Sequence, residues 1–379
     1  MGANASKHVD YLKGPVSLTF YKNPKTGKEI YIFGDLHVYD PKCKDDKKAD
    51  VDVVKFIENT LKSNPDKTID LFIESPMKTA DYQIAGSKWL KWLQSYQTGY
   101  IAAIQSHFWG CETFEKNCPY NNLRYHYIDW RLNPGVKTNQ YRLYSDIMNI
   151  GPSLILSDQI KWVMIDVTYN DFIGSKTMLM DGDFTLNSIL KNLKIDKQLA
   201  NIKDKKTRDK IYKYIQNTYK NTIIKPSKFF DTIIQYKKEW KKLSSKYNIK
   251  ATDTKAVKAN PEIMKLINNI NKFAIQASKS TYMIQDAYAL TRMFRSFKNA
   301  PEIQYVFLYV GAHHMAFYDA ILTKELGFNR INTSKDSLWT KVEHETDPMT
   351  LQTLLSTSSK KLDSKQCLYI GDFKQPFFV

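Results

Sequence analysis

The sequence has few cysteines and no long apolar run, and both shortages narrow the class of protein. Its four cysteines in 379 residues form neither a CxxC zinc pair nor a dense disulfide framework. A reducing compartment is therefore the expectation, with a loop closed by Cys111 and Cys118 as the open alternative. No apolar run approaches the roughly 18–20 residues of a membrane span. The N-terminus also lacks the shape of a secretory signal, so we expect a protein that is not secreted.

Acidic residues are also in short supply: 39 Asp and Glu stand against 56 Lys and Arg, which gives a net charge of +17. Residues 191–260 hold 20 Lys/Arg and 6 Asp/Glu, so this segment alone contributes +14. A basic segment can bind nucleic acid, anionic lipid or an acidic partner, and it can equally be a solvated helical face. Its cations are nearly all Lys, which argues against base-specific readout and makes nucleic acid the less favoured partner.

The first seven residues, Met-Gly-Ala-Asn-Ala-Ser-Lys, fit the N-myristoylation pattern. Removal of Met1 exposes Gly2, and Ser6 stands at the required position. One acyl chain binds membranes with a constant of only about 10⁴ M⁻¹, so lasting attachment needs a second signal. The Lys-rich segment, a partner protein or an assembly could supply it. The pattern therefore predicts a protein attached through N-myristate at Gly2 to the cytoplasmic face of a membrane or within a virion.

Alternating strand and helix patterns predict an α/β fold with a mixed, mainly parallel sheet flanked by helices. Strand-like residues 16–21 and 29–33 flank a turn and read as a hairpin. Helical spacing over 50–61 leads into a buried-type strand at 69–73, the signature of a parallel α/β unit. Further strands are expected at 124–128, 305–310 and 367–370, and helices at 83–108, 140–180, 282–297 and 315–322.

At 379 residues and 42% hydrophobic composition, the chain can form one large domain or two ordinary ones. We find no internal repeat, and residues 185–280 are helical in character and rich in Lys. The predicted organisation is an acylated arm at 1–15, a first part of the α/β core at 16–180, a Lys-rich helical insertion at 181–280, and a second part of the core with a C-terminal tail at 281–379.

Four of the expected strands run into polar residues where they end, and these endings are the candidate site. They are Gly34-Asp35-Leu36-His37, Glu74, Asp129 with Arg131, and Gly311-Ala312-His313-His314. The ends of parallel strands gather along one edge of a sheet, which is where such sheets bind ligands. Imidazoles and carboxylates at that edge are suitable ligands for a divalent transition metal.

The expected roles follow from the residue types. His37, His314 and Asp129 are the predicted metal ligands, and Glu74 is a general base or a further ligand. Arg131 and Arg292 are expected to stabilise a developing oxyanion. Asp35 and His313 are expected to lie just behind the ligands. His107, His126 and His344 lack this context and are expected to be structural or surface residues, which is also the alternative for any single histidine at a strand end.

The order of these motifs resembles the TraB/Tiki and erythromycin-esterase/ChaN-like hydrolase superfamily. The matching pieces are Gly34-x-x-His37, Glu74 after the next strand, Arg292 in a helix, and Val310-Gly311-Ala312-x-His314. The resemblance covers residues 29–131 and 280–325, and it makes His314 rather than His313 the matching histidine. It implies a metal-dependent hydrolase that acts on an amide or ester bond. The chain departs from the family where Met293 follows Arg292, a position often occupied there by Asn.

Two other functions stay open at this point. Gly34-Asp35-x-His37 is also similar to the opening motif of calcineurin-like metallophosphoesterases, but the later motifs of that family are missing, so phosphoesterase ranks second. The other alternative is a non-enzymatic membrane-associated or virion structural protein on a degenerate hydrolase fold. The Lys-, Asn- and Tyr-rich composition, together with the myristoylation pattern, resembles proteins of large DNA viruses.

Overall fold

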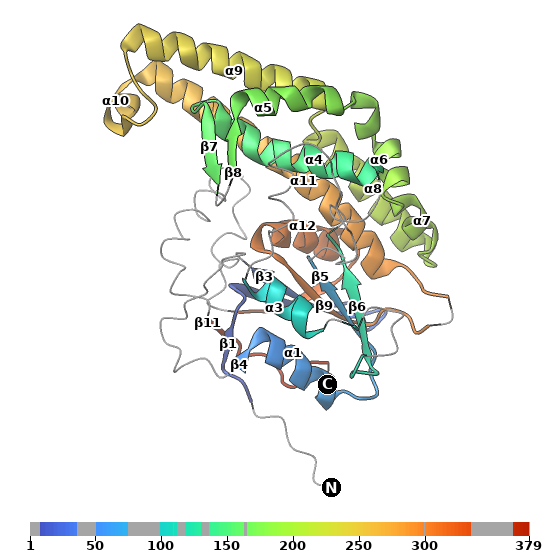
Figure 1. The fold of residues 1–379 in the computed structure, drawn as a ribbon. Coiled ribbons are helices and arrows are strands. Elements are labelled where there is room, and N and C mark those ends of the chain that lie inside the picture. Colours follow the sequence, from blue (N-terminus) through green and yellow to red (C-terminus); the bar gives the residue numbers. More distant parts are fainter. Residues whose placement is uncertain are drawn as a thin grey trace.

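The computed structural model describes residues 8–35, 51–74, 99–108, 110–111, 118–129, 136–162, 165–298, 300–334 and 367–378 (Figure 1). Several predictions fall outside these residues. They concern acylation at Gly2, the roles of His37 and Arg131, the surface position of His344, and most of the helix expected at 83–108, of which α3 (Gly99–His107) is described.

A six-stranded sheet is the centre of the fold, with the strand order β10-β2-β3-β9-β5-β6. The inner strands β3, β9 and β5 and the edge strand β6 run parallel, while β2 and β10 are antiparallel additions at the other edge. The expected α/β class, the hairpin and the parallel strands are confirmed, and β10 is an addition to them. The strands are β2 (Ser17–Lys22), β3 (Glu29–Asp35), β5 (Ile69–Ile73), β6 (Leu123–Tyr127), β9 (Tyr305–Gly311) and β10 (Asn329–Thr333).

Both faces of the sheet are covered at its inner strands, which explains why β5 and β9 read as nearly continuous apolar runs. Alternate residues of β9 enter two different cores: Leu308 packs on one side and Phe307 on the other. One core also contains α1 (Val53–Ser63), α3 and aromatic residues of the C-terminal tail such as Phe377. A small sheet of β1 (Tyr11–Lys13), β4 (Val51–Asp52) and β11 (Cys367–Tyr369) lies beside that core.

The other face of the sheet carries a thick helical layer that includes the Lys-rich segment. Its backbone is α11 (Pro261–Phe294), a helix of 34 residues that packs against α4, α8 and α9 and then continues over the sheet (Figure 1). The layer also contains α4 (Val136–Ile150), α5 (Tyr169–Gly174), α6 (Leu186–Asn192), α7 (Ile195–Ala200), α8 (Lys205–Thr222), α9 (Pro226–Tyr247), α10 (Thr254–Ala259) and the hairpin of β7 (Gln159–Trp162) and β8 (Ile165–Thr168).

This layer is larger than the predicted insertion and is continuous with the core. It begins at α4, before the expected boundary at residue 181, and α11 passes through the expected boundary at residue 280 without a break. The region expected to be helical at 140–180 also contains the β7–β8 hairpin. Helix α11 buries apolar residues along its whole length, so one element belongs to both the insertion and the core.

The Lys side chains of α8 and α9 face the solvent, while apolar stripes face inward. Ile211 and Ile215 are buried in α8, and α9 buries a stripe that includes Phe229 and Trp240. Lys237 is an exception, because its buried Nζ lies 2.8 Å from Asp158 Oδ1 and donates to the Leu154 carbonyl. The exposed lysines fit both a solvated face and a surface for an anionic partner.

Two further observations concern the environment of the chain. Cys111 and Cys118 form a disulfide, with their Cα atoms 4.4 Å apart, so the alternative left open by the sequence is the one that the structure contains. Among the described helices, none combines the length and the apolar character needed to cross a membrane.

Candidate functional site

The carboxyl ends of four parallel strands meet along one edge of the sheet, as the sequence predicted. Asp35 at the end of β3 is in register with Gly311 at the end of β9. Glu74 directly follows β5, and its backbone N–H donates to the Tyr309 carbonyl of β9 at 3.0 Å. Asp129 lies two residues beyond β6 and is 5% exposed. Asp35, Glu74, Asp129 and the Gly311 turn therefore belong to the same edge.

Gly34 allows β3 to lie close to the turn that follows β9. A Cβ atom at this position would be 2.2 Å from Ser17 Oγ and 3.2 Å from the Ala312 Cα atom. A larger residue would force the Ser17 hydroxyl to rotate away and would crowd the backbone of the turn at Ala312. The two Gly-containing motifs seen in the sequence are thus packed against each other.

Glu74 connects its own strand to the turn after β9. Its Oε2 atom accepts a hydrogen bond of 2.7 Å from the backbone N–H of Gly311. This bond leaves Oε1 directed toward His314, at 3.5 Å from the imidazole Nε2. One carboxylate oxygen therefore fixes the position of the group, and the other faces the candidate site.

His314 lies between two carboxylates. It ends the short 3₁₀ turn η6 (Ala312–His314), immediately before α12 (Met315–Ala320). Its Nδ1 atom is 2.7 Å from Asp286 Oδ1 of α11, and its ring contacts Tyr282 edge-on with centroids 5.1 Å apart. Burial favours the neutral imidazole, but the carboxylates of Asp286 and Glu74 outweigh it and raise the pKa of His314 to about 10.

Asp286 was not among the predicted site residues. It is 2% exposed and lies on the part of α11 that is buried against the sheet and α12. A sequence signal existed, because a carboxylate on an otherwise apolar helical face needs a buried partner. The nearby Tyr318 hydroxyl is fully buried, and burial raises the pKa of Tyr318 well above its usual value, with Asp286 adding to the effect.

The other predicted site residues divide into three groups. Asp35 lies at the edge, opposite Gly311. Its carboxylate adds to the effect of burial in raising the pKa of the Tyr309 hydroxyl. Arg292 hydrogen-bonds to the Tyr288 hydroxyl at 3.0 Å and influences the pKa of His126, so its described neighbours differ from those of Glu74. His37, Arg131 and the His313 side chain lie outside what the structure describes. Within the described ranges, no group of three or more His, Cys, Asp or Glu side chains is arranged to hold a metal.

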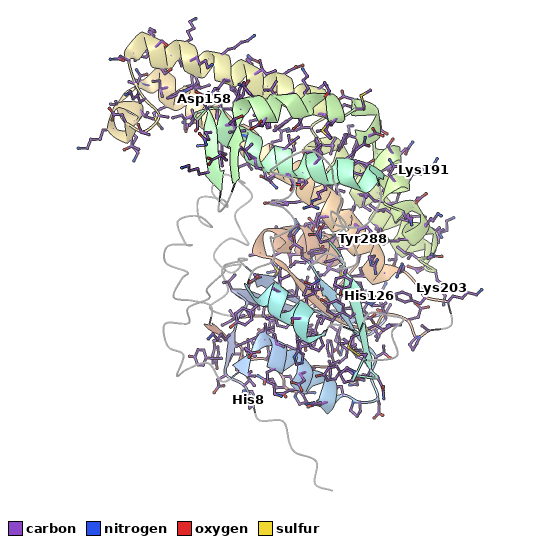
Figure 2. All side chains as sticks on the ribbon, in the orientation of Figure 1. His8, His126, Asp158, Lys191, Lys203 and Tyr288 are labelled. Carbon is purple, nitrogen blue, oxygen red and sulfur yellow. A yellow bond between two sulfur atoms is a disulfide. The ribbon has the colours of Figure 1, made fainter. Side chains whose placement is uncertain are left out.

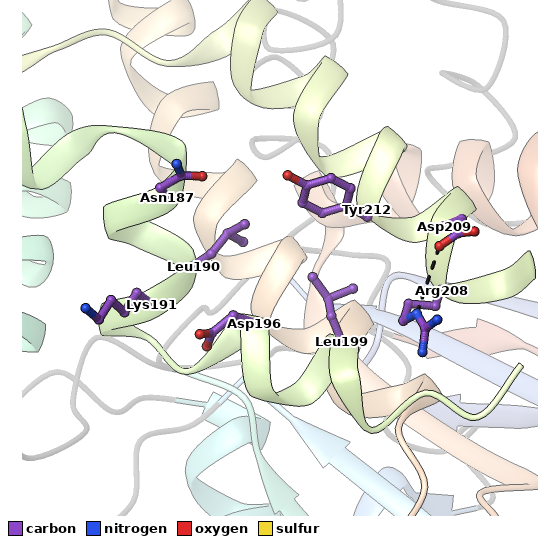
Figure 3. A pocket seen from close by; sticks show the side chains of 8 residues that line it. All are labelled: Asn187, Leu190, Lys191, Asp196, Leu199, Arg208, Asp209 and Tyr212. Carbon is purple, nitrogen blue, oxygen red and sulfur yellow. Dashed lines mark ion pairs between the residues drawn. The ribbon is translucent and has the colours of Figure 1, made fainter. Parts of the chain in front are cut away.

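A surface hollow of about 490 Å³ lies elsewhere, among α6, α7 and α8 (Figure 3). Its lining includes Leu190, Leu199 and Tyr212, together with charged residues such as the Arg208–Asp209 pair, 3.9 Å apart. It contains none of the edge residues. It therefore gives no support to the chemistry that the strand ends suggest.

Comparison with known protein families, with characterised proteins and with solved structures finds no match to this chain. The residues at the sheet edge are therefore the basis for assigning a function.

Proposed function

We propose that the protein is a metal-dependent hydrolase that acts on an amide or ester bond at the carboxyl edge of the sheet. The observation that carries this proposal is the buried His314 imidazole with one carboxylate on each nitrogen. Histidines that bind metals commonly hold a carboxylate on the second ring nitrogen, which fixes the tautomer and the ring orientation. Asp286 would have this role at Nδ1, and Nε2 would bind the metal.

The donor atoms fit such a site. His314 Nε2 and Glu74 Oε1 are 3.5 Å apart. Two ligands of one tetrahedral metal, each at ~2.1 Å, are separated by about 3.4 Å. Glu74 Oε1 faces His314, while Oε2 holds the Gly311 N–H. Asp129 at the same edge and His37, outside the described residues, are the proposed additional ligands.

The remaining chemistry is assigned to residues of the same edge. When bound, a divalent metal supplies a Lewis acid that polarises a carbonyl oxygen. Glu74 serves as a ligand or as the base that receives a proton, and Arg131, outside the described residues, is proposed to stabilise the oxyanion. The motif order that resembles the TraB/Tiki and ChaN-like hydrolases supports an amide or ester substrate over a phosphate ester.

The proposal includes attachment to a membrane. Myristate at Gly2 would supply one weak anchor, and the exposed lysines of α8 and α9 would supply an electrostatic one on anionic lipid. The two signals together are what lasting attachment requires. Mass spectrometry of the N-terminus and co-sedimentation with anionic vesicles would test both parts.

The test of the hydrolase is metal analysis of the purified protein, followed by activity on generic ester and peptide substrates. We expect a bound divalent metal and hydrolysis that a chelator removes. His314→Ala and Glu74→Ala should lose both, whereas His107→Ala should keep both, because His107 is an exposed histidine of α3. A metal-free protein, in which His314→Ala affects stability alone, would refute the proposal and favour the non-enzymatic alternative.

A further inference from the structure

A second polar cluster lies on the α11 face of the sheet, away from the carboxyl edge. Asp70, near the start of β5, is fully buried and receives two hydrogen bonds from Arg124 of β6, at 2.8 and 2.6 Å. Its Oδ1 atom is also 2.7 Å from His126 Nε2. Both carboxylate oxygens of Asp70 are thus already bonded within β5 and β6.

Two more arginines join this cluster from the C-terminal end of α11. Arg295 Cζ is 4.5 Å from the centre of the Phe297 ring, and Arg124 Cζ is 5.1 Å from the same ring. His126 stacks on Phe297 with ring centroids 5.8 Å apart. Arg292 donates a hydrogen bond to the Tyr288 hydroxyl. Figure 2 labels His126 and Tyr288, which mark this part of the molecule.

Positive charge exceeds negative charge here. Among the described neighbours, Asp70 is the buried carboxylate, and it is already bonded to Arg124. Glu302, whose backbone carbonyl accepts from Arg124, has an exposed carboxylate that pairs with Lys203 at 2.5 Å. Burial, with Arg292 close by, lowers the pKa of Arg295 to about 10. The two guanidinium groups at the end of α11 therefore lack a matching anion within the described part of the chain.

Three nitrogens of the cluster are buried and lack a hydrogen-bond partner among the described residues. They are Nε of Arg292, Nε of Arg295 and Nδ1 of His126. An unsatisfied buried donor costs roughly 1–3 kcal/mol, and more when the group is charged. Positive charges at a helix C-terminus interact favourably with the helix dipole, which favours arginines at this end of α11. It does not satisfy their Nε–H groups.

We propose that Arg292 and Arg295, together with His126, form a binding site for a small divalent oxyanion of the phosphate type. Guanidinium groups bind phosphate oxygens through paired charge-assisted hydrogen bonds. The role of His126 follows from its tautomer. A carboxylate only accepts hydrogen bonds, so Nε2 carries the proton toward Asp70, and Nδ1 presents a lone pair.

The lone pair on His126 distinguishes between oxyanions. Hydrogenphosphate carries a P–OH group that can donate to Nδ1 while its other oxygens accept from the arginines. Sulfate has similar size and charge but has no proton to donate. A phosphomonoester is mostly without its proton at neutral pH, since its second pKa is about 6. The site should therefore prefer inorganic phosphate to sulfate and to a phosphomonoester.

The test is thermal unfolding of the full chain with inorganic phosphate, sulfate, a phosphomonoester or chloride at equal ionic strength. Phosphate should raise the midpoint in a saturable manner, and chloride should not. Arg292→Gln and Arg295→Gln should each weaken phosphate binding by about tenfold or more, the expected loss of one charge-assisted bond. Arg208→Gln is the matched control, because Arg208 is a partly exposed arginine of α8.

Three results would overturn the proposal or one of its parts. A shift with phosphate no larger than with chloride, or unchanged binding in both glutamine variants, would remove the site. Equal affinity for sulfate would remove the role given to His126. Arg295→Lys keeps the positive charge and loses the planar fork. It should fold even where the glutamine variant does not, and it too should bind phosphate more weakly.

Discussion

Among the described residues, His126 and His314 are both buried and each has a carboxylate oxygen 2.7 Å from a ring nitrogen, yet their pKa values move in opposite directions. The Asp286 and Glu74 carboxylates raise the pKa of His314 to about 10. Burial lowers the pKa of His126 to about 4, although Asp70 contacts it at the same distance. The nearest partner therefore does not decide the charge of a buried imidazole in this protein.

The wider surroundings explain the difference. His314 has a second carboxylate, Glu74, on its other nitrogen. His126 shares Asp70 with Arg124, and Arg292 and Arg295 oppose any further positive charge. Asp286 and Arg292 are six residues apart on α11, about 9 Å at 1.5 Å per residue. Helix α11 thus places the negative charge of Asp286 beside His314 and the positive charge of Arg292 near His126.

The largest expected effect on stability comes from removing Asp70, the carboxylate beside His126. Asp70→Ala leaves Arg124 without its buried carboxylate, so we expect a loss of about 3–5 kcal/mol in the free energy of unfolding. The same change at Asp286 should cost less, because Glu74 still faces His314. Urea unfolding measures both, with Asp231→Ala as the exposed control. A stability of Asp70→Ala equal to that of the control would contradict this account of the cluster.

The next effect concerns pH. The folded pKa of His126 is about 4, against an ordinary value of 6.5, so below pH 6.5 the unfolded chain binds a proton that the folded chain does not. Stability should therefore fall as the pH drops from 6.5 to 4, by about 3 kcal/mol at 1.36 kcal/mol per pKa unit.

The His126→Phe variant keeps an aromatic ring against Phe72 and Phe297 but cannot bind a proton. The difference between its pH–stability curve and that of the wild type therefore isolates the contribution of His126. In the metal-free protein, the contribution of His314 has the opposite sign. Its contribution is fully present below pH 6.5 and is lost as the pH rises toward 10, and His314→Gln removes it. Unfolding curves of the wild type and the two variants that stay parallel over pH 4–10 would contradict both assignments.

The sequence predicts one of these regions much better than the other, for a physical reason. Glu74 and Gly311–His314 follow buried strands, and the rule that parallel strands end at one edge needs only the order of the elements. Asp286 and His126 lie within regular elements, and their partners come from other segments that no local pattern specifies. His126 was accordingly assigned as structural or surface, and the structure shows it fully buried against Asp70.

The position of Arg292 also depends on contacts that the sequence does not specify. The motif order grouped it with Glu74, because both belong to the pattern that resembles a hydrolase family. In the structure it bonds to Tyr288 and lies near His126 and Arg295. The direction of a helical side chain depends on the rotation of α11 against the sheet, which spacing in the sequence does not give.

The smallest of the three effects tests the His314 side without removing any proposed ligand. Asp286→Asn keeps the shape of the side chain but takes away the charge at Nδ1. Loss of such a partner typically lowers metal affinity by 10- to 100-fold, about 1.4–2.8 kcal/mol. The matched control is Asp319→Asn on α12, because Asp319 is also buried but binds Tyr21 and Arg330. It should reduce stability and leave metal affinity unchanged.

If both variants lower the metal affinity equally, Asp286 acts through general stability. If Asp286→Asn alone weakens it, the two carboxylates around His314 form a metal-binding unit that the Asp70 cluster, with its excess of arginine, cannot provide.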